Sequence, residues 1–600
     1  MGSGSPNTRT SPNRMLRIDL SSREVVSEPV PVDWQRQYLG GKGLGARYLY
    51  SELDPGVDPL GSDNVLLFVL GPLSGYLPGE QRYAAITKSP LTGTFLDSYA
   101  GGKFPARLAG ALGTHYGLLI TGSAREPVQI VVEGGDARVE PATTWGADAI
   151  ETARAFPDAA VACIGPAGER GVSYATIASD EAEHHAGRGG AGAVMGSKRL
   201  KAVVVRGEPP TPTDELAALQ DRETERYTDS PTGRWLSASG TVETVEFADE
   251  TDVLAARGWT QRGFDAAADV GVEPVREAAT ERERNGEIPG GFRVDTDAGT
   301  TVPRGATGMS LGAGLAIDEF DAVAALGATC NRLGLDLIDA GNAVAWAIRA
   351  AEEGYIDREI EFGDPDGART LLEEIATRET ALGDALAAGV ETAAERFGGE
   401  RIVPAVKGMS LPAYDPRGAS SMALAYATSD RGACHRRARP IEREVFDGPW
   451  SPERAAAAVI AAQNSRSVRW SLVADDFVGE TVMPEEWLDA VGAPYDELGR
   501  TGERIWNLIR LFNVREGFDR DDDTFPAALA ADRTLDSEGG LDSESRLDSD
   551  RFEAMLEAYY AERGWGADGL PTGATLRRLD LLSVLDADTP VSDQPVPEVE

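Results

Sequence analysis

The chain changes character near residue 210, and this change limits the folds open to it. Before that point, short runs rich in Val, Ile, Leu and aromatic residues are separated by Gly, Pro and Ser, which is typical of strands joined by tight turns. We predict strands at 65–70, 83–87, 117–121, 128–132, 159–164 and 202–206. After it, apolar residues recur at helical spacing. We predict helices at 214–228, 317–333, 341–353, 368–388, 452–464 and 502–513.

This pattern predicts an α+β fold, with a sheet-rich N-terminal domain followed by two mainly α-helical domains. A chain of 600 residues is long enough for several domains, each with its own core. The predicted domains span residues 15–210, 211–415 and 416–585. We expect a flexible tail at 1–14, a mobile acidic insertion near 535–551, where Asp, Glu and Ser dominate, and an acidic tail at 586–600.

The formal net charge of −40 excludes several classes of partner. Long-range repulsion opposes binding to nucleic acid and to anionic membrane surfaces, so we expect neither. Most of the basic residues are arginines. The six lysines are Lys42, Lys88, Lys103, Lys198, Lys201 and Lys407. High acidity with scarce lysine predicts a halophilic protein, adapted to a salt-rich cytoplasm.

Cysteine usage and hydropathy favour a cytoplasmic protein. The three cysteines, Cys163, Cys330 and Cys434, are too few and too widely spaced for a disulfide framework or a C-x-x-C metal site. They suit a reducing compartment. We find no apolar export signal at the start and no run of about 18 apolar residues that could span a membrane.

Two glycine-rich loops carry a cation. Residues 186–205 place five glycines around Arg188, and residues 40–45 enclose Lys42. Glycine lets the backbone approach a ligand closely, and an arginine fork suits phosphate, so the two loops suggest an anionic cofactor. Neither has the spacing of a Rossmann fingerprint or a P-loop, which argues against a dinucleotide-dependent dehydrogenase. Taken singly, each loop is also explained as a tight turn.

Several segments together resemble the aldehyde ferredoxin oxidoreductase family. In the N-terminal half these are RYAAITKSPLTGTFLDSYAGG at 82–102, IGPAGE at 164–169 and the glycine-rich loop at 187–198. In the C-terminal half they are CNRLGLDLIDAGN at 330–342, VKGMSLPAYDPRG at 406–418, ATSDRGACHRRA at 427–438 and ERIWNLIRLFNVREGFDRDDDTFP at 503–526. The resemblance runs in order from about residue 15 to residue 582.

The resemblance implies a tungsten (or molybdenum) bis-pyranopterin cofactor held between the N-terminal domain and the two helical domains. The family reaction oxidises an aldehyde to a carboxylic acid, with water as the source of oxygen. A [4Fe–4S] cluster beside the pterin passes the electrons to ferredoxin. Members of the family often form homodimers.

The resemblance also implies roles for individual residues. Arg82 and Arg188 would bind the pterin phosphates, with the open backbone of Gly189 and Gly190 beside them. The backbone carbonyls of Tyr99 and Gly189 would hold a magnesium ion, which prefers oxygen ligands. The remaining two residues, Asp336 and Lys407, would hydrogen-bond the pterin rings. The alternative for Asp336 is a helix cap, the commoner use of such a residue.

The chain departs from the family where the cluster cysteines should be. A [4Fe–4S] cluster needs about four thiolates. Residues 259–304, which should supply three of them, contain no cysteine. In the segment WSLVAD, Trp470 stands where the family has a pterin-binding aspartate, and Asp475 stands where it has the fourth cysteine. We therefore predict that this chain lacks the cluster.

The acid–base residues of the family are also replaced. Arg304, Gly305 and Ala306 stand where the resemblance predicts a Glu-Tyr-Glu stretch, and Ala405 stands where it predicts a histidine. His435 is the one catalytic candidate, with the role of an ordinary structural histidine as the alternative.

Two hypotheses about the function stay open. One is a tungstopterin oxidoreductase whose electrons leave without the cluster; the other is a catalytically silent pterin-binding homologue that acts as a partner or regulatory subunit.

Overall fold

The computed structural model describes residues 11–529 and 547–597. Most of the predicted N-terminal tail and acidic insertion lies outside these residues. The described edges of both segments belong to the fold. The backbone N–H of Asn13 donates to the carbonyl of Thr114 at 2.9 Å, and the first strand begins at Arg14. At the other segment, a helix begins at Ser549, inside the stretch predicted to be mobile.

A six-stranded sheet opens the chain. Its strand order is β2-β1-β6-β3-β4-β5, with only β1 and β6 parallel. Alternate residues of β3 point to opposite faces, and both faces are buried. Leu66 and Phe68 enter the core shared with the second sheet, whereas Leu67 and Val69 face α2 and α21. The strands are β1 (Arg14–Asp19), β2 (Glu24–Pro29), β3 (Leu66–Val69), β4 (Tyr83–Lys88), β5 (Phe95–Ala100) and β6 (His115–Thr121).

A second six-stranded sheet packs against the first across one apolar core, which contains Ile130 and Val203 of the second sheet and Phe68 of the first. Its order is β11-β10-β9-β12-β7-β8, with only β12 and β7 parallel. The strands are β7 (Val128–Glu133), β8 (Asp136–Pro141), β9 (Ala160–Cys163), β10 (Ile177–Ser179), β11 (His184–Ala186) and β12 (Leu200–Arg206). The helices of this region are α1 (Val32–Tyr38), α2 (Gly41–Glu52), α3 (Phe104–Leu112), α4 (Ala149–Arg154), α5 (Pro166–Glu169) and α6 (Ala191–Ser197).

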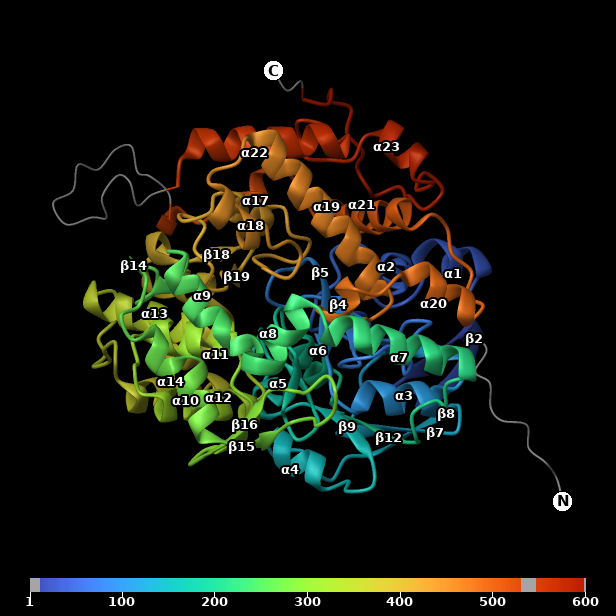
Figure 1. Cartoon of the computed structure of the whole chain (residues 1–600), viewed down its shortest axis with the longest axis horizontal. Helices are drawn as coiled ribbons and strands as arrows, with labels where there is room; N and C mark the ends of the chain where they lie inside the picture. The colour runs from blue at the N-terminus through green and yellow to red at the C-terminus, as the bar shows by residue number, and fades with distance from the viewer. Residues whose placement is uncertain (1–10, 530–546, 598–600) are drawn as a thin grey trace.

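Helices dominate from residue 214 onward, which confirms the predicted fold class (Figure 1). The first group is α7 (Asp214–Thr228), α8 (Pro231–Ser239), α9 (Thr244–Glu250), α10 (Val272–Ala278), α11 (Gly305–Thr307), α12 (Phe320–Leu333), α13 (Leu337–Glu352), α14 (Pro365–Thr377), α15 (Ala381–Ala387) and α16 (Val390–Phe397). The second group is α17 (Ser421–Ala427), α18 (Ile441–Asp447), α19 (Pro452–Ser471), α20 (Pro484–Ala490), α21 (Leu498–Arg515), α22 (Ser549–Arg563) and α23 (Gly573–Arg578).

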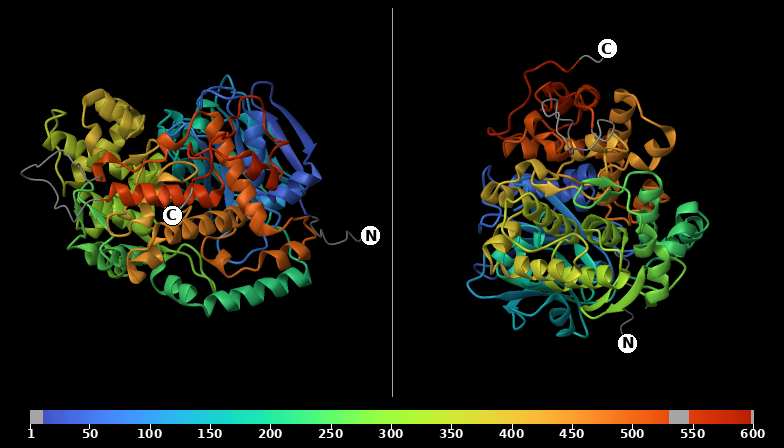
Figure 2. Two further views of the ribbon diagram at one scale, coloured as in Figure 1. Left: turned by 90° about the horizontal axis from the view of Figure 1, so that it is seen from above. Right: turned by 90° about the vertical axis from the view of Figure 1, so that its left-hand side faces the viewer.

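Short strands connect the helices. They are β13 (Ala255–Ala256), β14 (Gln261–Arg262), β15 (Ala279–Arg282), β16 (Phe292–Thr296), β17 (Gly299–Thr301), β18 (Ala405–Val406) and β19 (Met409–Ser410). In the left-hand view of Figure 2, α12–α16 lie at the end of the molecule opposite β1 and β2, and the C-terminal helices lie between these two regions. None of the described helices is long and apolar enough to cross a membrane.

All six strands and five of the six helices predicted above form where the pattern placed them. The predicted helix at 368–388 is wrong in one respect, because it is two helices, α14 and α15. The chain breaks at Arg378, which adopts the left-handed conformation (φ 57°), and Thr380 then caps α15. Arg378 is held there by Asp384 and by the carbonyl of Gly171.

The second glycine-rich loop is the first turn of α2, and it joins two regions of the fold. Lys42 is fully buried and pairs with Asp97 of β5 and with Asp430. Arg437 pairs with the same two carboxylates, and Trp470 lies over both cations. Two buried cations thus balance two buried anions, which is the condition under which burial of charge is tolerated. The Lys42 ammonium group is thus occupied by protein carboxylates, which favours the structural alternative for this loop.

Candidate functional site

A cavity of about 380 Å³ lies where the three regions of the chain meet. Its wall comes from residues 80–101 and 176–188 of the sheets, from residues 227–338, and from residues 412–478. Seven arginines, six carboxylates and three histidines line it. They are Arg82, Arg188, Arg284, Arg304, Arg431, Arg436 and Arg439; Glu80, Glu183, Glu283, Asp336, Asp475 and Asp476; and His184, His185 and His435.

Several cationic groups of the wall keep donors free. The Nε atoms of Arg82, Arg431 and Arg436 are buried and find no hydrogen-bond partner among the described residues. An unpaired buried donor costs about 1–3 kcal/mol. In a chain of net charge −40, this concentration of unpaired arginine donors in one cavity indicates a site for an anion.

The first glycine-rich loop supplies one wall. Arg188 adopts a left-handed backbone (φ 69°), which is strained for a residue with a side chain. Its N–H donates to Asp336 at 3.0 Å, its carbonyl accepts from Ser98, and its guanidinium donates to the carbonyls of Ser410 and Ala433. These bonds fix the loop, so that Gly187 and Arg188 line the cavity.

Asp336 does cap a helix, as the alternative reading proposed. One carboxylate oxygen accepts from the N–H of Asp339 at 3.0 Å, at the start of α13, and the other holds the N–H of Arg188. Asp336 still lines the cavity. The neighbouring Asp339 carboxylate lies 3.2 Å from the Arg188 Nε. Burial raises the pKa of Asp339 to about 6, against the opposing charge of Arg188.

His435 faces the cavity as a neutral ring. Burial, together with Arg439 and Arg436, holds its pKa well below the ordinary value, and its Nδ1 has no partner among the described residues. It lies against Tyr414, with ring centroids 5.6 Å apart. A histidine so hard to protonate is a weak base, and it serves better to hydrogen-bond a ligand than to carry a proton.

Cys434 also lines the cavity. Burial opposes its ionisation, but Arg431, Arg437 and Arg188 outweigh burial and lower its pKa to about 7. The Arg431 Nη2 lies 3.2 Å from its sulfur. The other two cysteines lie outside the cavity, and burial raises the pKa of both Cys163 and Cys330 to about 12.

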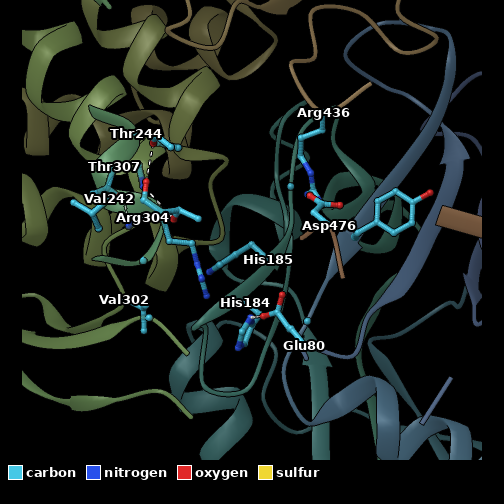
Figure 3. A pocket seen from close by; sticks show the side chains of 18 of the residues that line it. Glu80, His184, His185, Val242, Thr244, Val302, Arg304, Thr307, Arg436 and Asp476 are labelled. Carbon is cyan, nitrogen blue, oxygen red and sulfur yellow. Dashed lines mark hydrogen bonds and ion pairs between the residues drawn. The ribbon is translucent and has the colours of Figure 1, made fainter. Parts of the chain in front are cut away.

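One side of the cavity holds a chain of ion pairs. Glu80 lies 2.5 Å from Arg82 and 2.8 Å from the Nδ1 of His184. Across from them, Glu283 accepts from Arg304 at 2.9 Å. Figure 3 shows Glu80 and His184 in contact, with the Arg304 side chain reaching toward them from the helical side. Burial opposes the ionisation of Glu80, but Arg82 and His184 hold its pKa well below the ordinary value.

The residues that replace the family's cluster cysteine and aspartate have structural partners of their own. Asp475 accepts from the backbone N–H groups of Phe477 and Glu80. The Trp470 indole donates to Asp476 at 3.0 Å, and that carboxylate also pairs with Arg436 at 2.6 Å. This wall therefore offers carboxylates and cations where a cluster would need sulfur.

The structure brings together only some of the residues predicted from sequence. The cavity is lined by Arg82, Tyr99, Arg188, Asp336 and His435, whereas Gly189, Gly190 and Lys407 are absent from its lining.

The three residues outside the lining have protein partners. The Gly189 carbonyl accepts from the Ser89 hydroxyl at 2.7 Å, and Gly190 packs against the carbonyl of Ser173. The Lys407 ammonium group pairs at 2.8 Å with Asp523, a fully buried carboxylate, and its role as a pterin contact stays a prediction.

Sequence reasoning missed most of the wall. Glu80 and Glu283 look like any of the 98 acidic residues, so nothing in the sequence distinguishes them. Arg431 and Arg436 stand in the segment SDRGACHRR, whose density of cations in an acidic chain was the available signal. His184 precedes the glycine-rich loop directly, and that position was the clue to its role.

The donor set of the cavity fits one implied group and not the other. Unpaired arginine donors and open backbone suit the phosphates of a pyranopterin, and Arg82, Arg188, Arg431 and Arg436 are placed to hold them. A [4Fe–4S] cluster does not fit, because the chain has three cysteines in all and Cys434 alone lines the cavity.

Comparison with known proteins agrees with this architecture. Residues 15–207 match the model of the aldehyde ferredoxin oxidoreductase N-terminal domain, and residues 218–581 match that of domains 2 and 3. The chain is 31% identical to the tungsten-containing aldehyde ferredoxin oxidoreductase of Pyrococcus furiosus, over 93% of this chain and 96% of that protein. It is 32% identical to the enzyme of the same name from Thermococcus kodakarensis, with the same coverage.

Two further similarities are more distant. The WOR-like subunit of an aliphatic sulfonate oxidoreductase from Pyrococcus furiosus is 25% identical over 95% of this chain and 96% of that subunit. Among solved structures, the active-site complex BamBC of benzoyl coenzyme A reductase with 1,5-dienoyl-CoA contains a chain of the same fold. The TM-score is 0.81 at 22% identity, with 96% of this chain and 98% of that chain covered.

Proposed function

Since this chain belongs to the aldehyde ferredoxin oxidoreductase family, we propose that it is a tungsten (or molybdenum) bis-pyranopterin oxidoreductase that oxidises aldehydes to carboxylic acids. The observation that carries the proposal is the arginine cradle, defined as Arg82, Arg188, Arg431 and Arg436. Three of its members keep a buried Nε without a partner among the described residues. Such donors are costly unless an anion satisfies them.

The reaction balances as aldehyde plus water to carboxylic acid, two electrons and two protons. When bound, the metallopterin would supply the redox centre that accepts the electron pair. The chain's own residues would hold the cofactor and orient the substrate. The cradle would bind the cofactor phosphates, and the neutral His435, with its free Nδ1, would hydrogen-bond the substrate or the water beside it.

The proposed magnesium ion would take the backbone carbonyls of Tyr99 and Gly189 as ligands, by resemblance to the family. The Ser89 hydroxyl already donates to the Gly189 carbonyl, so the ion would use that oxygen's second lone pair.

We further propose that a soluble acceptor such as ferredoxin takes up the electrons, and that the protein assembles as a homodimer. Because the cysteines do not provide a cluster, the acceptor would have to reach the cavity directly.

A second candidate function is a catalytically silent pterin-binding homologue, acting as a partner or regulatory subunit. The observation that favours it is the absence of a carboxylate–imidazole pair at the family positions. Arg304 pairs with Glu283 there, and Ala405 is part of the short strand β18. Such a pair contributes about 10²–10⁴ in rate.

Metal content and aldehyde-dependent dye reduction separate the two functions. The protein is produced with tungstate or molybdate, and bound metal and pterin are measured before the assay. We expect both metal and activity. Metal without activity supports the silent homologue, and the absence of metal and pterin refutes both functions.

A variant tests the arginine cradle itself: Arg436→Gln should lower the cofactor content. Arg138→Gln, in an exposed ion pair with Glu140, should leave it unchanged and serves as the control.

A further inference from the structure

Three side chains from separate parts of the chain meet at one wall of the cavity. Glu80 precedes β4, His184 lies in β11, and Glu283 follows β15. A ligand-type atom from each lies within 4.8 Å of the others. All three side chains are at least nine-tenths buried, with exposed fractions of 9%, 8% and 5%.

From this geometry we propose that Glu80, His184 and Glu283 form a binding site for one divalent first-row transition-metal cation, in the wall of the same cavity and next to Arg82 of the arginine cradle. One imidazole and two carboxylates are a ligand set suited to Zn²⁺, Fe²⁺ or Mn²⁺. This triad does not depend on the proposed enzymatic function.

The separations are close to those that a shared cation requires. Two ligand atoms about 2.1 Å from one metal, at angles of 90–110°, lie roughly 3.0–3.4 Å apart. The His184 Nδ1 and the Glu80 oxygen are 2.8 Å apart, the distance of a direct ion pair, so a cation would widen this pair slightly. Glu283 comes from the β15–β16 hairpin, so a modest movement of that side chain would complete the site.

The surroundings support the ligands. Arg82 holds one oxygen of Glu80, whose other oxygen lies beside His184, and Glu283 is held by Arg304 and by the backbone N–H of Gly291. Ligating carboxylates are commonly anchored in this way.

The immediate surroundings of the imidazole are acidic. Glu80 and Glu283 both act on His184 as anions, and Arg304 acts on it as a cation, so carboxylates outnumber arginines at this one residue. A divalent cation at the triad would lie between these two carboxylates.

The site has a structural consequence. Residues 259–304 and position 475 are where the cluster cysteines should stand, and Glu283 and Asp475 line this same wall. A cation held by the triad would join the β15–β16 hairpin to the sheet region and close the wall.

The test uses the full chain as purified, stripped of loosely bound metal with a chelator and titrated with zinc chloride by calorimetry. Separate titrations with ferrous and manganous salts rank the three cations. We expect about one high-affinity Zn²⁺ per chain and a higher melting temperature in its presence. His184→Ala, Glu80→Gln and Glu283→Gln should each weaken binding at least about tenfold.

Glu183→Gln is the matched control. Glu183 also lines the cavity and neighbours His184, but it pairs with Arg293 at 2.6 Å, outside the triad, so its replacement should leave zinc affinity unchanged. X-ray absorption at the zinc edge provides a readout that needs no variant: nitrogen and oxygen ligands without sulfur are expected. A sulfur ligand would place the metal at Cys434 and overturn the proposal. So would the absence of zinc binding, or equal binding by the wild type and the three variants.

Discussion

Cys434 should be alkylated at neutral pH while Cys163 and Cys330 stay unmodified. The thiolate is the reacting form. With its pKa lowered to about 7, Cys434 is about half thiolate at pH 7. The other two, with pKa values raised to about 12, are thiolate in about one molecule in 10⁵. Of the three, Cys434 alone lines the cavity, so access and ionisation favour the same residue.

Arg431→Gln tests the cause of this selectivity. The Arg431 Nη2 lies 3.2 Å from the sulfur and Arg431 lowers the pKa of Cys434 more than the other arginines do, so its loss should raise that pKa toward its ordinary value. A thiol with the ordinary pKa near 9 would be alkylated roughly 50-fold more slowly at pH 7 than Cys434, because so much less of it is thiolate. Since Arg437 and Arg188 remain in the variant, we expect a smaller decrease, of about 5–10-fold.

The assay is labelling of the native protein with iodoacetamide between pH 6 and 9, with each cysteine followed by peptide mass spectrometry. Inorganic phosphate, as a probe of the arginine cradle, should slow the labelling of Cys434. Modification of Cys163 or Cys330 first, or an unreactive Cys434 at pH 9, would refute the assignment of Cys434 to an open, cationic cavity.

Three further predictions concern stability. Lys407→Met should lower the free energy of unfolding by about 2 kcal/mol, because the buried Asp523 keeps Arg510 but loses its second cation. Lys103→Met, at an exposed position, should change it little, and equal denaturation midpoints would contradict the pairing. Because the pKa of Asp339 is raised to about 6 in the folded protein, its protonation stabilises the fold fully below the unfolded pKa near 4, and this stabilisation is lost as the pH rises through about 6. Asp339→Asn should therefore reduce the fall in the free energy of unfolding between pH 4 and 7, measured by urea denaturation. An unaltered pH profile would exclude Asp339 as the source of that fall. Raising salt from about 0.1 M to about 2 M should raise the melting temperature, because it screens the net charge of −40, and a fall would count against halophilic adaptation.

The sequence predicted the fold well because periodicity is a local property. The strand at 83–87 and the helix at 214–228 carry their hydrophobic pattern in adjacent residues, and both form as expected. Arg378 was missed because its left-handed conformation depends on Asp384 and on a carbonyl 207 residues away in the chain.

The site was only partly predictable because its wall is assembled from distant segments. Arg82 and Arg188 were found through the resemblance. Glu80 and Glu283, 203 residues apart, are adjacent only after folding. The motif around Lys407 identifies the residue without showing which way its side chain points, and the structure places its ammonium group against Asp523.

Elemental analysis of the purified protein tests the central claim most directly, since it measures tungsten, molybdenum and iron in one sample. The arginine cradle and the missing thiolates predict about one tungsten or molybdenum per chain, with iron far below the four per chain that a cluster requires. Four irons per chain, or neither tungsten nor molybdenum after growth with both oxyanions, would contradict it.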